Sequence, residues 1–376
     1  MHYCLFVSYF PHLVAGPIIH HGQMMPQFTS SCTYRLNWQN IAVGLTIFTI
    51  GLVKKTFFAD GVAVYATPVF DAASSGAPIL FFESWVGALA YTLQLYFDFS
   101  GYSDMAIGLS KMFNVKLPLN FNSPCKAVNI IEFWRRWHMT LSRFLRDYLY
   151  IPLGGNRHGS AHRYMNLVLT MLLGGLWHGG GWTFLIWGGL HGFYLATNHG
   201  WQALKKTPVF EKFIKRKTVN QSRAMARLAS HLLTFFAVVI AWVFFRASNV
   251  GSATYLVKSM LGLNGFSLPE SWAGNVVGTW LASHGATFQG LIPNIPQEAL
   301  SAFLWISALL AIVWLFPNTQ QITASYQPTS DRIESPLSPP VLRWSPTLPW
   351  ASLTAILLTI GVLELNKVSE FLYFQF

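Results

Sequence analysis

The sequence has few charged residues for its length. Only 10% of its 376 residues are Asp, Glu, Lys or Arg, whereas a soluble globular domain averages about 25%. A chain so poor in charge cannot cover a water-facing surface, so we expect lipid to surround much of it. Hydrophobic residues make up 52% of the chain and aromatic residues 16%, which is typical of apolar membrane spans with aromatic belts at their ends.

Cysteine and acidic residues are also scarce. The three cysteines, Cys4, Cys32 and Cys125, form no CxxC pair, so their spacing predicts neither a metal site nor a disulfide framework. The 14 acidic residues face 25 basic ones, which gives a net charge of +11. Nucleic-acid binding is one interpretation of that balance. The basic residues lie in short runs between apolar stretches, however, which is the positive-inside pattern of a membrane protein, so we expect a lipid bilayer and no nucleic acid as partner.

Long apolar stretches are what the sequence does contain. A spanning helix needs about 20 mostly apolar residues, and stretches near this length predict an all-α, multi-pass membrane protein. The predicted spans are Trp85–Leu109, Tyr164–Trp177, Trp182–Thr197, Leu228–Phe245, Leu300–Phe316 and Leu348–Leu365. Ile41–Val53 is apolar but short, which predicts a tilted, re-entrant or broken span.

Basic loops indicate the orientation of these spans. The segments Arg157 to Arg163 and Lys205 to Arg227 are rich in Lys and Arg, so both are expected on the cytoplasmic side. The two apolar arms between them then form a hairpin with its tip at Trp177–Trp182. If each further span crosses the membrane once, residues 246–297 lie outside and residues 318–347 lie inside. Lys54 and Lys55 indicate a further cytoplasmic point, that is, another place where the chain reaches the cytoplasmic side.

The tip of this hairpin carries an ionisable residue, His178. Three glycines follow it, and glycine commonly ends a helix by adopting positive φ. An ionisable side chain at membrane depth is a candidate functional residue; the alternative is a histidine that ties down a helix end. For His191, on the returning helix, a structural hydrogen bond between helices is the favoured interpretation.

The segment Asn129–Leu149 alternates charged and apolar residues with helical periodicity. At 100° per residue one face carries Glu132, Arg136, Arg143 and Asp147, with Arg135 and Arg146 beside it, and the other carries Phe133, Trp134, Trp137, Leu141, Phe144, Leu145 and Tyr148. The charged face predicts i,i+4 pairs on a solvated surface or, alternatively, arginines that hold an anionic donor phosphate. His138 lies on the apolar face, away from the charges.

A group of polar residues interrupts the apolar stretch before this segment. The seven-residue stretch from Asp98 to Asp104 contains two carboxylates, and the hydroxyls of Ser100, Tyr102 and Ser103 lie between them. Such groups are costly in hydrocarbon unless they face a polar interior. A hydrogen-bonded lock between helices is the favoured hypothesis, and the lining of a substrate channel is the alternative.

Several long strings in the sequence are distinctive. They include QLYFDFSGYSDMAIG (Gln94–Gly108), the string from Phe121 to Arg157 that contains RRWH, and GGLWHGGGWTFLIWGGLHG (Gly174–Gly192). These strings resemble the membrane-bound O-acyltransferase family, most closely its alginate O-acetyltransferase branch. The resemblance implies a multi-helix bundle with a tunnel through the bilayer and amphipathic surface helices. It also implies one membrane-embedded acyltransferase domain over residues 1–376, shortened at its N-terminus because family members carry further apolar segments before the string that begins at Phe10.

The resemblance also implies roles for particular residues and partners. The family's essential histidine matches His178, and its second marked histidine matches His138. A hydroxyl that attacks a thioester needs a base near neutral pKa, and histidine supplies one. We therefore expect His178 to be the base, kept neutral by burial beside Trp177 and Trp182, and His138 to orient the donor or stabilise the oxyanion. The expected substrate-binding residues are Arg135, Arg136, Trp137, Trp177, Asp98, Tyr102 and His191.

The expected reaction is acyl transfer, most simply acetyl transfer, in a bacterial inner membrane. The donor would be a cytoplasmic acyl thioester such as acetyl-CoA, used as a substrate and with no bound cofactor. The acceptor would be a hydroxyl of an exported polysaccharide such as alginate, with periplasmic acetyl-transfer partner proteins. Three alternatives stay open: a covalent acyl-enzyme route, a transporter of donor or polymer without catalysis, and a scaffold without activity.

The basic loop Lys205 to Arg227 gives a direct test of orientation. Because its basic residues favour the cytoplasm, single cysteines placed in it should resist an impermeant thiol reagent in intact cells and react after the cells are opened. Efficient labelling of intact cells would reverse the orientation of the hairpin.

Overall fold

The structure is a computed structural model that describes residues 2–13, 16–208, 220–333, 342–365 and 372. Its helices and strands, in chain order, are α1 His2–Ser8, η1 Phe10–His12, α2 His21–Thr29, η2 Ser31–Tyr34, α3 Trp38–Val53, η3 Lys54–Ala59, α4 Asp60–Ser75, α5 Phe81–Met112, η4 Pro124–Lys126, α6 Ile130–Trp134, α7 Met139–Leu145, η5 Arg146–Tyr150, α8 Gly159–His178, α9 Trp182–Lys205, α11 Asn220–Arg246, α12 Val250–Met260, β1 Phe266–Ser267, η6 Glu270–Trp272, α13 Val276–Ser283, β2 Ala286–Thr287, α14 Ala299–Leu315, α15 Thr319–Ile322, η7 Ala324–Tyr326 and α16 Leu348–Glu364.

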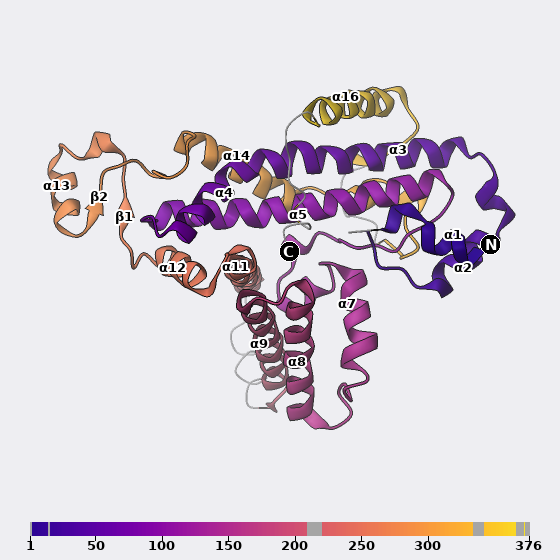
Figure 1. Ribbon diagram of the computed structural model, residues 1–376, viewed down its shortest axis with the longest axis horizontal. Coiled ribbons are helices and arrows are strands. Elements are labelled where there is room, and N and C mark those ends of the chain that lie inside the picture. The colour runs from indigo at the N-terminus through magenta and orange to yellow at the C-terminus, as the bar shows by residue number, and fades with distance from the viewer. Residues whose placement is uncertain (1, 14–15, 209–219, 334–341, 366–371, 373–376) are drawn as a thin grey trace.

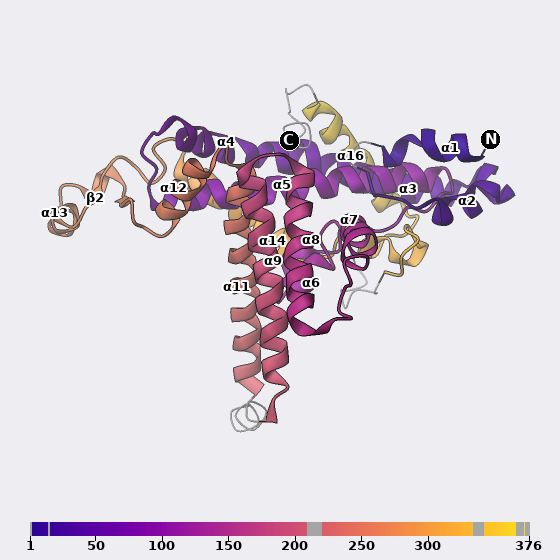
Figure 2. The same ribbon diagram turned by 60° about the horizontal axis from the view of Figure 1, so that its bottom comes forward.

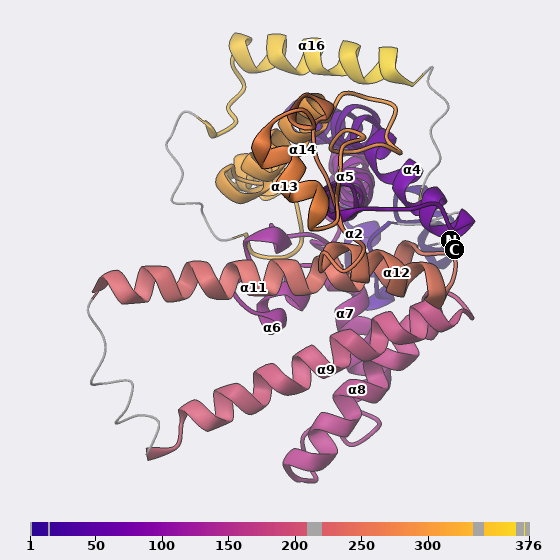
Figure 3. The ribbon, with the colours of Figure 1, turned by 90° about the vertical axis from the view of Figure 1, so that its left-hand side faces the viewer.

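Helices dominate the fold, as the composition predicts. In the described residues the strands are limited to β1 and β2, which pair in parallel over two residues each. A long antiparallel pair, α3–α4 against α5, runs through the molecule, and α8 and α9 lie side by side and extend away from it, with α11 in contact with α9 (Figures 1 and 2). Figure 3 shows α16 on the opposite side of this pair from α8 and α9.

The first long helix corrects the expectation for Ile41–Val53. That segment is the first part of a continuous helical stretch, Trp38–Ser75, of 38 residues. At 1.5 Å per residue it is about 57 Å long, well beyond the roughly 30 Å of a hydrocarbon core. A turn of π-helix at Lys54–Ala59 joins α3 to α4 without breaking it, so the segment is neither short nor re-entrant.

Close glycine contacts let α3 and α5 approach each other. A Cβ added at Gly44 would lie 2.5 Å from the backbone oxygen of Gly108, and one added at Gly51 would lie 2.6 Å from that of Gly101. Glycine is therefore required at both crossings because the two backbones touch there. Small residues at such positions are the usual means by which membrane helices pack closely.

Buried ion pairs fix the register of the same two helices. Lys54 Nζ lies 2.6 Å from an Asp104 carboxylate oxygen, and Lys55 Nζ lies 3.0 Å from Asp98 and 2.7 Å from Asp60. Asp104 also accepts hydrogen bonds from Thr319 Oγ1 and Gln320 Nε2, each at 2.6 Å. The polar group in α5 is thus the predicted lock between helices. The side chains of Lys54 and Lys55 are buried within the pair, and their assignment to a cytoplasmic point stays a prediction.

Two helical stretches in the described part of the chain are long and apolar enough to cross a membrane. They are Trp38–Ser75 and Ala224–Arg246, and α14 and α16 are shorter apolar helices. The hairpin predicted around His178 is present as α8 and α9, whose 20 and 24 residues extend beyond the two apolar arms. Part of the loop Lys205 to Arg227, residues 209–219, lies outside the described residues.

The lock between α3 and α5 predicts a strong effect of removing one of its charges. Asp104→Asn would leave Lys54 as an unpaired buried cation, and removing one partner of a buried pair typically costs about 3–5 kcal/mol. We expect a clearly lower melting temperature in detergent for this variant. Asp147→Asn is the matched control, because Asp147 pairs with Arg146 where the two side chains are 38% and 60% exposed, and such pairs contribute little. Equal shifts for the two variants would contradict the lock.

Candidate active site

His178 is the last residue of α8, at the glycine-rich turn into α9. The turn differs from the prediction, because Gly179 is extended (φ 171°) and not left-handed. A Cβ added at Gly179 would lie 2.5 Å from the Phe184 ring, so glycine is needed there for close packing. The His178 ring centroid lies 4.9 Å from Trp177, 5.3 Å from Trp187 and 5.1 Å from Phe245.

The expectation that Trp177 and Trp182 bury His178 is therefore only partly right. Trp177 touches the ring but is 50% exposed, and Trp182 is 73% exposed, whereas Trp187 is buried (2% exposed). Trp187 lies on α9 about one turn after Trp182, and its ring packs edge-on against His178. No described residue makes a hydrogen bond to the His178 ring, so its two nitrogens are available to a substrate.

His138 lies in a break between two short helices. The segment 129–149 was expected to be one continuous amphipathic helix, but it is divided into α6, α7 and a π-helical turn, η5. His138 itself has a left-handed backbone (φ 41°). The break arises because Asn120 bonds the first backbone N–H groups of α7: its carbonyl oxygen accepts from Met139 N at 2.9 Å and its side-chain Oδ1 from Thr140 N at 3.3 Å. Helical periodicity cannot reveal such a distant acceptor.

The break changes the charge pairs predicted for that segment. Glu132 and Arg136 do form the predicted i,i+4 pair, at 2.7 Å. The predicted pair of Arg143 with Asp147 does not form. Arg143 pairs instead with Asp331 at 2.9 Å, and Asp147 with its neighbour Arg146 at 2.7 Å.

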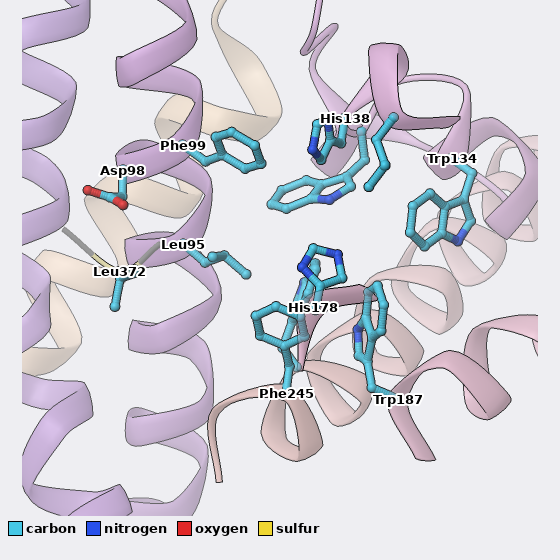
Figure 4. A pocket seen from close by; sticks show the side chains of 12 residues that line it. Leu95, Asp98, Phe99, Trp134, His138, His178, Trp187, Phe245 and Leu372 are labelled. Atoms are coloured by element: carbon cyan, nitrogen blue, oxygen red, sulfur yellow. The ribbon is translucent and has the colours of Figure 1, made fainter. Parts of the chain in front are cut away.

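One buried pocket brings the two histidines together. It is lined by Leu372 and by residues of α5, of the 130–145 segment and of the α8, α9 and α11 helices: Leu95, Asp98, Phe99, Trp134, Trp137, His138, Leu141, His178, Trp187, Trp242 and Phe245. Figure 4 shows His138 and His178 facing this space from opposite sides, with Asp98 beyond Leu95 on the α5 side. The cavity is small, about 30 Å³, and its walls are mostly aromatic.

A second, wider cavity borders this pocket at Trp134. Its volume is about 540 Å³, and its polar lining is mainly basic, with Arg135, Arg143, Arg146, Arg163 and His199 among the residues around it. Arg163 Nη2 lies 2.6 Å from His199 Nδ1, while Arg135 is exposed and has no ion pair among the described residues. The arrangement places positive charge beside the aromatic pocket.

The predicted substrate-binding residues divide among these places. Trp137 and Asp98 line the pocket with the histidines, and Arg135 lines the basic cavity. The others lie elsewhere: Arg136 is held by Glu132, the Tyr102 hydroxyl donates to the Leu13 carbonyl at 2.9 Å, and Trp177 is outside the pocket lining.

The expected structural role of His191 is confirmed. His191 is fully buried, and its Nδ1 accepts a hydrogen bond from Trp134 Nε1 at 3.2 Å, which ties α9 to α6. It lies behind Trp134 and does not line the pocket.

Three residues of the site were not anticipated from the sequence. Trp187 could have been suspected because it lies on the same returning helix as the glycine turn, but nothing in its spacing separates it from a lipid-facing residue. Arg163 was read only as a topology signal. Asn120 offered a weak signal, a single amide after an apolar run, LPL.

Comparisons with known proteins agree with the family resemblance. Residues 1–229 match the model of the membrane-bound O-acyltransferase family, MBOAT. The chain is 52% identical over 266 residues to the peptidoglycan O-acetyltransferase of Helicobacter pylori, covering 71% of this chain and 47% of that protein. It is 37% identical over 395 residues to "Probable alginate O-acetylase AlgI" of Pseudomonas aeruginosa, covering 100% of this chain and 71% of that protein.

A more distant relative carries another acyl group in its name. The chain is 26% identical over 233 residues to the teichoic acid D-alanyltransferase of Streptococcus thermophilus, covering 59% of this chain and 53% of that protein. The chain spans about half the length of several of these relatives. The family match covers both histidines and more than half of the sequence, and the chain belongs to the membrane-bound O-acyltransferase family.

Proposed function

We propose that this chain is an O-acyltransferase that moves an acetyl group from a thioester donor to a hydroxyl acceptor. The observation that carries the proposal is the convergence of His178 and His138, from separate segments, on one aromatic pocket beside a basic cavity. An acyl transfer needs this combination: a base in a dry site and a place for an anionic donor.

His178 is the base in this proposal. The acceptor hydroxyl oxygen attacks the thioester carbon while its proton passes to a ring nitrogen of His178. The tetrahedral intermediate then collapses, the carbon–sulfur bond breaks, and the leaving thiolate takes the proton back from the imidazolium. The products are an ester and a thiol, and the histidine returns to its neutral form. The aromatic lining excludes water that would hydrolyse the thioester.

The size of the pocket supports a short acyl group. A cavity of about 30 Å³ is only two to three times the roughly 10–15 Å³ that one water molecule needs, so a small acetyl group needs less movement of its walls than a long acyl chain does. The names of two relatives, a peptidoglycan O-acetyltransferase and an alginate O-acetylase, support the same acyl group.

The basic cavity supports a donor with a phosphate head. Arginine binds phosphate through paired, charge-assisted hydrogen bonds, and Arg135 and Arg163 line this cavity. Arg163 precedes His178 by 15 residues on α8, a rise of about 22 Å. A donor that contacts both must carry its thioester on a long flexible arm, as a pantetheine thioester such as acetyl-CoA does. The basic loop at the start of α8 supports a cytoplasmic position for this cavity.

The acceptor in this proposal comes from the opposite side of the membrane. The chain would lie in a bacterial inner membrane as a multi-pass bundle, with a tunnel that leads from the basic cavity through the histidine pocket. An exported polysaccharide such as alginate would receive the acetyl group, with periplasmic partner proteins completing the transfer. The alginate O-acetylase relatives and the positive-inside pattern support this direction.

His178→Gln tests the proposal. Glutamine preserves much of the size and some hydrogen-bonding capacity but cannot take up a proton, and general-base catalysis contributes on the order of 10²–10⁴-fold. Transfer of labelled acetyl groups to a hydroxyl acceptor, by membranes or detergent-purified protein with any partner proteins it requires, should therefore fall at least 10²-fold. The melting temperature should stay near wild type because no described residue hydrogen-bonds the His178 ring.

His162→Gln is the matched control, because His162 lies on the same helix but is exposed. Retention of most activity by His178→Gln would refute the assignment of the base. A protein that moves donor or polymer across the membrane without any acetyl transfer would establish the transporter alternative instead.

The basic cavity gives a separate prediction. Arg135→Ala combined with Arg163→Ala should raise the KM for acetyl-CoA about 10–100-fold with a much smaller change in kcat, because hydrogen bonds to charged groups contribute about 1.5–3 kcal/mol and bind the donor far from the reacting carbon. Arg136→Ala is the control, since Arg136 pairs with Glu132 away from the cavity. An unchanged KM for the double variant, or an equal rise for the control, would rule out this cavity as the donor site.

A further inference from the structure

Asn120 joins three parts of the site through one side chain. It is fully buried (0% exposed) and precedes the short segment that leads to α6. Its Oδ1 lies 3.0 Å from His138 Nδ1, 2.9 Å from Thr140 Oγ1 and 3.3 Å from Thr140 N. Its Nδ2 donates to Ser103 Oγ, on α5, at 3.1 Å.

The bond from Thr140 fixes the orientation of the Asn120 amide. A backbone N–H can only donate, so the side-chain atom that receives it must be the amide oxygen. The Thr140 hydroxyl points the same way: it accepts from Ile18 N at 3.1 Å, and its own proton is directed to Asn120. The amide nitrogen is thereby turned to Ser103, and only the oxygen faces His138.

An oxygen that faces His138 Nδ1 determines the tautomer of this histidine. The amide oxygen is an acceptor only, so Nδ1 must carry the proton. In a neutral imidazole the other nitrogen, Nε2, then holds the lone pair. Among the described residues Nε2 has no hydrogen-bond partner, and the ring lines the pocket opposite His178 (Figure 4). Burial, with His178 nearby, lowers the pKa of His138 and so favours the neutral ring.

We propose that Asn120 is a positioning residue that holds His138 as the Nδ1–H tautomer, so that Nε2 offers a hydrogen-bond acceptor to the substrates in the pocket. This inference rests on the proposed acyl transfer. Nε2 of neutral His138 then accepts a hydrogen bond from an N–H or O–H of the acyl donor or of the acyl acceptor. It does not donate a hydrogen bond to an oxyanion. Of the two roles expected for His138, the geometry therefore selects orientation of the substrate.

A purely structural role for Asn120 predicts different behaviour. Its backbone oxygen holds Met139 N, and that bond survives any change of side chain. Its amide nitrogen holds Ser103, and that bond is removed by Ser103→Ala without touching His138. The side-chain oxygen also holds Thr140 N and Thr140 Oγ1, so a loss in Asn120→Leu alone does not separate the two interpretations. The acidic limb of Asn120→Asp and the protonation of His138 Nδ1 do separate them.

The kinetic experiment compares Asn120→Leu, Asn120→Asp and Ser103→Ala in the full chain. Leucine removes the acceptor, so kcat should fall about 10²-fold, the size of loss that misplacement of a reactant can cause. Aspartate restores an acceptor and should recover much of that loss. Its carboxylate stabilises the imidazolium and raises the pKa of His138, so His138 loses its neutral form at a higher pH and the acidic limb of the kcat profile moves upward. Ser103→Ala should stay close to wild type.

Equal impairment of the leucine and aspartate variants with an unmoved acidic limb would overturn the inference, as would a loss in Ser103→Ala as large as in Asn120→Leu. These outcomes are distinct from failure of the acyl-transfer proposal, which His178→Gln decides in the same assay.

A second measurement reads the tautomer without activity. Nitrogen NMR of histidine-labelled protein, with the His138 signals assigned by their loss in His138→Gln, should show a protonated Nδ1 and an unprotonated Nε2 in the wild type. The pattern should change in Asn120→Leu. An unprotonated Nδ1 in the wild type would contradict the role of Asn120 even if the kinetic losses were large.

Discussion

The register between α3 and α5 is the constraint on which the site depends. Charges in an apolar interior are stable only when they are paired, and here Lys54 and Lys55 reach across to Asp104 and Asp98 at 2.6 and 3.0 Å. A slide of one helix along the other would separate both pairs at once. The glycine contacts at Gly44 and Gly51 hold the backbones close enough for the lysines to reach. α5 is therefore held in one position along its length.

That fixed position carries over to the histidine pocket. Within a short stretch α5 contributes Leu95, Asp98 and Phe99 to the pocket wall and Ser103 to the Asn120 amide. The Phe99 ring centroid lies 4.7 Å from that of His138. One face of α5 thus carries the carboxylates that pair with Lys54 and Lys55, and the adjacent face contacts His138. The sequence offered two hypotheses for the polar residues of α5, a lock between helices and the lining of a channel. Asp98 combines a pairing role with a lining position, because it pairs with Lys55 and also lines the pocket.

The sequence was sufficient for features that depend on local pattern. Apolar length, the glycine turn after His178 and the family strings predicted the α8–α9 hairpin with His178 at its tip, and the polar residues of α5 predicted a lock. Features set by distant contacts could not be predicted in this way. The 129–149 segment has good helical periodicity, yet Asn120 ends it at His138 by competing for the first N–H groups of α7. The burial of Lys54 and Lys55 is such a feature, because the α5 carboxylates that they reach, Asp104 and Asp98, lie 50 and 43 residues away in the sequence.

The two cavities differ in size and in the polarity of their walls, and Trp134 lines both. The aromatic pocket is small and mostly apolar, which strengthens electrostatic interactions within it but leaves no room for a charged head. The basic cavity is wide and open, which suits a hydrated phosphate but provides no protected place for a reactive intermediate. Trp134 lines both, and its indole N–H is already used by His191 on α9. Its position is therefore set from behind by α9, so the side chain that separates the two cavities is held in one orientation.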